Sequence, residues 1–234
     1  RGKVLGGSSA INAMLYVRGQ AEDYDAWAAR GNAGWSYLDV LPYFKKSENC
    51  QIASLQEAKD MQFRGADGPL KVNAIRSTYP ILDRLMESAQ SLQFPINADY
   101  NGQTQEGFGY YQLTQSHGLR FSAKKAYLAP VRRRSNLTVL TKCQVIGLDI
   151  DHNKTARGVH VFRSGRRQNL QATREVILSA GAIQSPQLLE LSGIGDPKIL
   201  QKHGLAVTHP LSGVGEHLSD HYISRLSWQL SADL

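Results

Sequence analysis

Apolar residues recur at helical spacing in three segments of the first half of the chain. Residues 21–30 open with acidic side chains and are followed by Gly31, a pattern typical of a helix that ends at a glycine. A second helix is predicted after Ser36, because Asp39 stands three positions later and the two can form a capping box. A third begins near Pro80 and carries apolar side chains on one face: Ile81, Leu82, Leu85, Met86, Ala89 and Leu92.

The pattern changes to that of strands in the second half. Residues 137–150, 158–163 and 168–180 are rich in β-branched residues and are separated by short turns, which predicts a three-stranded meander. The last of these strands is expected to end in a buried run at 176–178. Apolar and polar residues alternate again over 222–230, which predicts the start of a further strand.

Two short helices are predicted between these strands. Ser185 is expected to be the N-cap of the first, with Pro186 at its first helical position and Gly193 after its end. Asp196 and Pro197 open the second helix by the same logic.

Composition places the chain among ordinary globular proteins. Of its 234 residues 41% are apolar and 20% charged, with 21 Gly and 8 Pro, which excludes collagen, coiled coils and disordered tails. Cys50 and Cys143 lie far apart in the sequence and form no C-x-x-C pair, so neither a metal site nor a disulfide framework is expected. The sequence has no targeting signature and no apolar run near the roughly 18 residues of a membrane span. We interpret it as an internal part of a larger soluble protein.

The chain is basic, with 27 Lys and Arg against 20 Asp and Glu. This balance favours anionic partners without choosing among nucleotides, phosphates and acidic membrane surfaces. The basic runs at 124–125, 132–134 and 166–167 are interpreted as solvated faces, and a peripheral membrane contact is kept as an alternative. No aromatic residue interrupts the arginine runs, so no nucleic-acid partner is expected.

Two segments of small residues carry the candidate chemistry. Gly6, Gly7, Ser8 and Ser9 form a loop without bulky side chains, and a second such loop follows the predicted meander over 181–195. A backbone of this kind allows close approach by a phosphate or a planar cofactor, although the first loop alone can equally be a tight turn. Neither is a G-x-G-x-x-G fingerprint.

Three blocks of the sequence resemble the signatures of the glucose–methanol–choline (GMC) family of flavin oxidoreductases, and most of all its choline dehydrogenase-like members. The blocks are GKVLGGSSAIN at 2–12, continued by YVRG at 16–19 and DYD at 23–25, then GAIQSPQLLELSGIG at 181–195, and GVGEHLSDH at 213–221. They stand in the order that the family has, and the resemblance covers essentially the whole chain.

The resemblance implies FAD in a Rossmann-like domain and the oxidation of an alcohol by hydride transfer to flavin N5. It implies that Asn12 makes a polar contact near the reactive edge of the ring and that the strand of Val145 holds the adenine. The implied cofactor-binding residues are Val4, Leu5, Gly6, Gly7, Ser8, Ser9, Asn12, Ala13, Met14, Leu15, Val145, Ala180 and Gly181.

Two departures from the family pattern matter. Some relatives carry a histidine just before the asparagine and bind FAD covalently, whereas Ile11 stands there in this chain, so non-covalent FAD is predicted. The family's dinucleotide fingerprint is expected before Arg1 and its catalytic His after Leu234, so no catalytic residue is assigned within the chain. His217 and His221 lie in a matched block and are expected to have structural or cofactor-adjacent roles.

The implied fold class is α/β, an incomplete Rossmann-like FAD-binding domain with part of an inserted substrate-binding domain. Residues 1–50 and 120–221 are assigned to the FAD-binding domain, 51–119 to the substrate-binding domain, and 222–234 to the truncated start of a substrate-domain sheet. Tyr100, Tyr110 and Tyr111 are candidates for lining the alcohol pocket, with plain packing as the alternative.

Three functional alternatives remain open from the sequence. A flavin-containing lyase of the GMC type, such as a hydroxynitrile lyase, would share these signatures, and the chain by itself can also be inactive. A non-enzymatic basic module is the least favoured. The alcohol and the electron acceptor, whether oxygen, a quinone or another compound, stay open, and a cytoplasmic location or one peripheral to the inner membrane is favoured.

Overall fold

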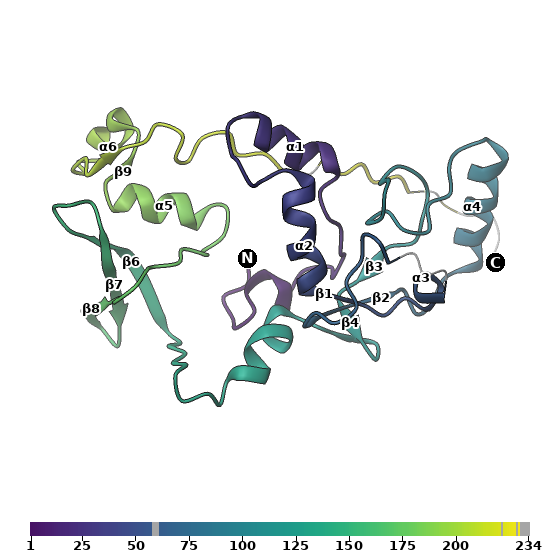
Figure 1. Ribbon diagram of the computed structural model, residues 1–234, viewed down its shortest axis with the longest axis horizontal. Coiled ribbons are helices and arrows are strands. Elements are labelled where there is room, and N and C mark those ends of the chain that lie inside the picture. The colour runs from purple at the N-terminus through teal and green to yellow at the C-terminus, as the bar shows by residue number, and fades with distance from the viewer. Residues whose placement is uncertain (58–60, 221, 228, 230–234) are drawn as a thin grey trace. The chain divides into compact units, whose positions relative to one another are not determined.

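The structure, a computed structural model, describes residues 1–57, 61–220, 222–227 and 229. These residues form two compact units, Arg1–Leu137 and Thr138–Gln229 (Figure 1). Helices and strands occur in both, as expected for a mixed α/β chain.

The predicted helices of the first unit are confirmed. Helix α1 is Ala21–Ala29, and α2 is Tyr37–Ser47, where the capping box of Ser36 and Asp39 is formed. The two helices pack through aromatic rings, since Tyr24 lies 5.5 Å from Phe44 between ring centroids. Helix α4 is Pro80–Ser91, with Pro80 in its first turn.

The first unit also contains a small three-stranded sheet that was not predicted from the sequence. Strand β2 (Leu70–Ala74) pairs in parallel with β1 (Glu48–Cys50) and antiparallel with β3 (Gln112–Leu113). Short helix α3 (Ala53–Glu57) packs Leu55 beside Cys50 in the core. Strands of two to five residues contain too few alternating positions to give a period-two signal.

A hairpin and two tight turns complete the first unit. Strands β4 (Gln115–Ser116) and β5 (Leu119–Arg120) pair with each other, and the backbone then forms a π-helical turn at Lys124–Leu128 and a 3-10 turn at Ala129–Val131. Arg120, at the end of this hairpin, donates hydrogen bonds to the small-residue loop and to Asn12.

The second unit contains the predicted meander, in shorter form. Strands β6 (Cys143–Ile150), β7 (Ala156–Arg163) and β8 (Arg166–Gln171) are antiparallel neighbours (Figure 1). The predicted buried strand at 176–178 is wrong, because it pairs with no strand among the described residues and Ile177 is 77% exposed. An apolar run becomes a strand only where another backbone can complete its hydrogen bonds.

Helix α5 (Gln184–Leu191) and helix α6 (Pro197–Lys202) follow, with β9 (Ile194–Gly195) and β10 (His209–Pro210) as a short parallel pair. Asp196 caps α6 as predicted, because its Oδ1 accepts a hydrogen bond of 2.7 Å from the Lys198 N–H. The predicted cap of α5 is wrong. The helix begins one residue before Ser185, and the Ser185 hydroxyl accepts a hydrogen bond from the backbone of Ala180 instead.

The last predicted strand is absent from the part of it that the structure describes. Residues 222–227 have no strand pairing, and Tyr222 and Leu226 are 96% and 73% exposed. Trp228 and 230–234 lie outside the described residues. Alternation alone supplies an apolar face and no partner strand. Among the described helices none is long and apolar enough to cross a membrane.

Candidate functional site

The small-residue loop of the first unit forms a tight turn that presents bare backbone. Gly6 and Gly7 have positive φ angles of 99° and 55°, and the 3-10 turn Gly7–Ala10 follows directly. A side chain at Gly7 would meet nothing within 4 Å, so this backbone is open on one side. Gly2 is the opposite case, since its Cβ would lie 2.2 Å from the Gly7 carbonyl oxygen. The turn is therefore closed on the side of Gly2 and open at Gly7.

The loop is held by a segment more than a hundred residues away. The Ser9 hydroxyl accepts a hydrogen bond of 2.9 Å from the backbone N–H of Ala123 and donates to the Gly6 carbonyl. Further along, the Met14 carbonyl accepts from the Thr114 N–H at 2.8 Å, and Leu15 forms an isolated antiparallel bridge with Leu113. The sequence predicted the loop and not the residues that fix it.

Asn12 stands at the end of this loop with its carbonyl oxygen fully engaged. Its Oδ1 accepts from the Met14 N–H at 3.1 Å and from Arg120 Nη1 at 2.8 Å. The same Arg120 nitrogen also donates to the Ser9 carbonyl at 3.2 Å. Arg120 thus places a positive charge beside the loop, and no motif in the sequence pointed to it.

In the second unit, Val145 and Ala180 line one open hollow of about 640 Å³. Its walls are largely apolar side chains from β6, from the extended segment 177–180 and from α5. Gly181, the next residue, has a positive φ of 95°, and its carbonyl accepts from the Ser185 N–H at 2.9 Å. The structure therefore brings the second group of predicted residues together at one place.

Both groups have the chemistry that FAD requires. A pyrophosphate needs backbone that it can approach closely, and the open face of Gly7 offers it. A planar ring needs apolar walls with a few polar groups, which the hollow at Val145 and Ala180 provides with Gln184 and Gln187 at its margin. The predicted residues of 4–15 lie in the first unit, and Val145, Ala180 and Gly181 lie in the second.

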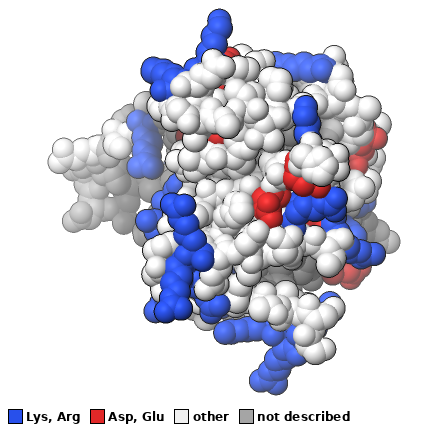
Figure 2. Space-filling view, turned by 90° about the vertical axis from the view of Figure 1, so that its left-hand side faces the viewer, with Lys and Arg blue, Asp and Glu red and all other residues white. Residues whose placement is uncertain are grey.

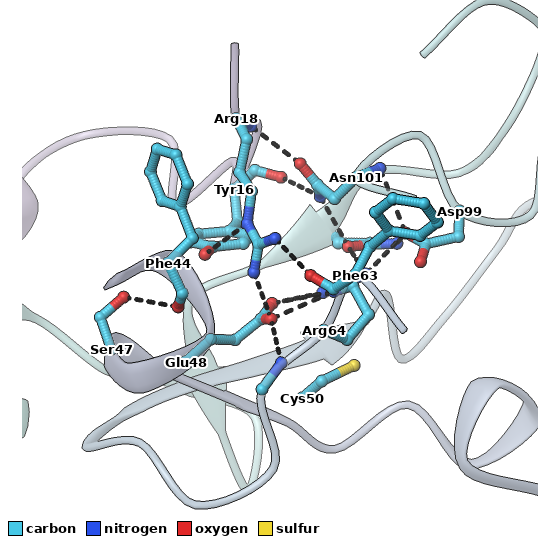
Figure 3. Close-up of polar contacts among 12 residues, drawn as sticks. Tyr16, Arg18, Phe44, Ser47, Glu48, Cys50, Phe63, Arg64, Asp99 and Asn101 are labelled. Atoms are coloured by element: carbon cyan, nitrogen blue, oxygen red, sulfur yellow. Dashed lines mark hydrogen bonds and ion pairs between the residues drawn. The ribbon is translucent and has the colours of Figure 1, made fainter. Parts of the chain in front are cut away.

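A buried cluster of charged residues supports the segment that follows the loop (Figure 3). Both oxygens of the Glu48 carboxylate accept hydrogen bonds, Oε2 from Arg18 at 2.6 Å and both from Arg64 Nε at 3.1 Å. The side chains of Glu48 and Arg64 have no exposed surface, and that of Arg18 is 3% exposed. No sequence motif indicates this cluster, because its charged residues come from separate segments of the chain.

The other end of Arg64 is also satisfied. Its Nη1 donates to Asp99 Oδ1 at 2.5 Å and to Gln112 Oε1 at 3.0 Å. Burial alone would lower the pKa of the Arg64 guanidinium. The hydrogen bonds and negative charge of Glu48, followed by the charge of Asp99, have the larger effect, so the net pKa is raised. Arg64 is therefore charged at every relevant pH, and two arginines face two carboxylates.

The predicted pocket tyrosines have other partners. The Tyr100 hydroxyl donates to the Tyr16 carbonyl at 3.0 Å and accepts from the Gln112 N–H at 2.6 Å, and burial raises its pKa to about 12. The Tyr110 hydroxyl donates to Asp83, and Tyr111 is 56% exposed with its ring edge-on to Tyr100. Tyr100 also lines a hollow of about 210 Å³ together with Gln20 and Gln105, and a role of the three tyrosines at an alcohol pocket stays a prediction.

Histidines and metal ligands give no second candidate among the described residues. His217 is exposed, and His221 lies outside the described residues. No group of three or more metal-binding side chains occurs in the described part of the chain. In Figure 2 the Lys and Arg side chains are more prominent than the acidic ones, as the net charge of +7 implies.

Comparison with known proteins identifies the family. The model for GMC oxidoreductases matches residues 1–223. The oxygen-dependent choline dehydrogenase of Photobacterium profundum is 45% identical over 223 residues, which are 94% of this chain and 38% of that protein. The mitochondrial choline dehydrogenase of Homo sapiens is 43% identical over 221 residues, covering 94% of this chain and 36% of that protein.

A solved structure agrees with the sequence comparisons. An FAD-dependent oxidoreductase from Chaetomium thermophilum is similar with a TM-score of 0.82 and 32% identity, over 90% of this chain and 38% of that one. The chain thus spans less than two fifths of the length of these relatives. The three signature blocks, the family match over 1–223 and the structural likeness agree, and the chain belongs to the GMC oxidoreductase family.

Proposed function

We propose that the protein containing this chain is an FAD-dependent oxidoreductase that acts on the CH–OH group of an alcohol, in the manner of choline dehydrogenase. The observation that carries this proposal is the small-residue loop at 6–9, open at Gly7 and followed by a fixed Asn12. Relatives named as choline dehydrogenases, at 43% to 45% identity, support the same substrate class.

Within this proposal each group of residues has a distinct task. Gly6 and Gly7 allow the pyrophosphate to approach the backbone, while residues 12–15 lie against the ring. The hollow lined by Val145 and Ala180, with Gly181 next to it in the chain, would receive the adenine end. FAD, when bound, would supply the hydride-accepting redox chemistry that oxidation of the alcohol needs. The base that accepts the hydroxyl proton is proposed to lie outside residues 1–234.

We further propose that FAD is held without a covalent bond. Ile11 is 58% exposed beside Asn12 and has no nucleophilic atom. Residues 1–15 contain no His, Cys or Tyr, the side chains that could form such a bond from this loop. Release of FAD on denaturation is the direct consequence.

The partner of the protein is proposed to be a small-molecule alcohol and an electron acceptor, which can be oxygen or a quinone. The basic composition is compatible with a cytoplasmic protein or with one peripheral to the inner membrane. The proposal assigns to no residue of this chain the task of distinguishing choline from other alcohols.

The test uses the protein expressed from its complete coding sequence. Its visible spectrum is recorded before and after denaturation and then anaerobically with choline, with an aliphatic alcohol and with an aromatic alcohol. We expect that denaturation releases the flavin into the supernatant. In the native protein we expect that an alcohol bleaches the flavin absorption bands.

Two results contradict the proposal in different ways. Absence of flavin even after incubation with FAD would refute the cofactor and the reaction together. Flavin that no alcohol bleaches would refute the oxidoreductase and favour a lyase, for which cleavage of a hydroxynitrile is then assayed.

A further inference from the structure

Arg120 approaches the small-residue loop from β5, a strand with no part in the family signatures quoted above. It follows a tight turn in which His117 and Gly118 both have positive φ angles, of 51° and 75°. Its backbone carbonyl accepts a hydrogen bond of 2.8 Å from Lys125 Nζ, which fixes the strand end. The guanidinium then reaches the carbonyl of Ser9 and the side chain of Asn12.

The two donors at Asn12 determine which way its amide faces. Oδ1 receives the Met14 N–H and Arg120 Nη1, at 3.1 and 2.8 Å. If the amide were turned over, its NH₂ group would stand against two N–H donors, and both hydrogen bonds would be lost. The oxygen is therefore held inward.

The other end of the amide is consequently presented outward. Asn12 is exposed, and among the described residues its Nδ2 donates no hydrogen bond, whereas its Oδ1 accepts two. An asparagine can offer either a donor or an acceptor to a ligand, and here only the donor remains available.

We propose that Arg120 is a positioning residue, which locks the Asn12 amide so that its NH₂ group donates a hydrogen bond to an acceptor atom of the bound flavin. The acceptor class is a ring nitrogen or a carbonyl oxygen. This inference rests on the proposed function, since it requires FAD at the loop. It adds a residue whose effect on the cofactor passes through Asn12.

The first test is substitution of Asn12 in the protein made from its complete coding sequence, measuring the FAD dissociation constant by titration of the apoprotein. Asn12→Asp keeps an oxygen for Arg120 and Met14 but turns an acceptor and a charge outward. We expect at least a tenfold weaker FAD affinity, with the apoprotein melting temperature unchanged. Wild-type affinity in Asn12→Asp would overturn the inference.

The second test asks whether Arg120 acts through Asn12. Arg120→Met is compared in the wild-type and in the Asn12→Ala background, because two residues that act together give non-additive effects. We expect Arg120→Met to weaken FAD binding about three- to tenfold with Asn12 present and less than about twofold without it. Arg120→Lys, which keeps a donor, should recover part of the loss.

Arg133→Met is the matched control, since it removes the same charge from an exposed position beyond the loop. Equal losses for Arg120→Met in both backgrounds would mean that it acts through the Ser9 carbonyl or through charge, and would overturn the inference. A wild-type protein that binds no FAD would instead refute the proposed function. If the wild-type protein binds FAD and none of these substitutions changes the FAD affinity, only the role of Arg120 is refuted.

Discussion

The carboxylate of Glu48 and the guanidinium of Arg64 face each other in the interior of the first unit, and neither side chain has exposed surface. Arg64 Nε lies 3.1 Å from both carboxylate oxygens, and the backbone N–H of Gly65 adds a third donor to Oε2 at 3.0 Å. Arg18 approaches the same carboxylate from the segment that leaves the small-residue loop. One carboxylate therefore joins three segments of the chain.

Glu48→Gln is expected to destabilise the first unit strongly. The substitution leaves Arg18 and Arg64 buried with one negative charge fewer, and breaking a buried ion pair costs about 3–5 kcal/mol of unfolding free energy. Urea unfolding followed by circular dichroism measures this. Glu87→Gln is the control, because its pair with Arg84 is exposed and should change stability little. Equal stability of Glu48→Gln and wild type would contradict the role of the cluster.

Stability is expected to fall at alkaline pH because of Tyr100. Burial raises its pKa from 10.0 to about 12, so the folded state binds the proton more tightly than the unfolded state. The resulting stabilisation is complete below pH 10.0 and is lost as pH rises through about 12. Absorbance at a tyrosinate wavelength should show a late-titrating component that Tyr100→Phe reduces without abolishing, because burial also raises the pKa of Tyr16. A titration identical in Tyr100→Phe and wild type would refute this assignment.

Gly7→Ala is expected to lower FAD affinity more than stability. The φ of 55° costs a non-glycine residue about 1–2 kcal/mol, but the new methyl group meets nothing in the protein. Gly31→Ala has the same kind of cost, at φ 94° with open surroundings, and lies outside the proposed cofactor loop. Unfolding and FAD titration of both variants separate the two effects. A similar FAD affinity for both variants would remove Gly7 from the cofactor site.

Ser192→Ala is expected to loosen the junction of α5 and β6. The Ser192 hydroxyl accepts from the Leu148 N–H at 2.8 Å and donates to the Leu188 carbonyl at 2.6 Å. Its loss leaves a backbone donor unpaired near the irregularity between Val145 and Gly147, at a cost of about 1–2 kcal/mol. Hydrogen exchange at the Leu148 amide should accelerate. Ser212→Ala, at an exposed position, is the control. Unchanged exchange in Ser192→Ala would show that the hydroxyl is dispensable.

Local signals in the sequence predicted the local elements well. The capping box of Ser36 and Asp39 and the proline and aspartate at the start of α6 each lie within four residues, so the sequence alone contains the interaction. Family signatures led to the family itself, which the comparisons confirm, and they drew attention to the small-residue loop. The assignment of individual residues to FAD stays a prediction.

Features that depend on contacts between residues far apart in the sequence were not predicted, or were predicted wrongly. Glu48, Arg64 and Asp99 are ordinary polar residues in the sequence, and only folding shows that they are buried together. Arg120 contacts Asn12 across 108 positions, which no local pattern can reveal. The prediction of a buried strand at 176–178 was wrong, because the apolar residues of a segment carry no information on whether a neighbouring strand is available to pair with it.

The hydrogen bond from the Ala123 N–H to the Ser9 hydroxyl has a consequence during synthesis of the chain. The two residues are 114 positions apart, and a ribosome adds about 5–20 residues per second. The glycine turn is therefore synthesised roughly 6–23 s before its anchoring segment. Until then it lacks the contacts that give it its final shape. A nascent chain stalled before residue 120 should be unable to hold the small-residue loop in its final conformation, whatever the concentration of FAD around it.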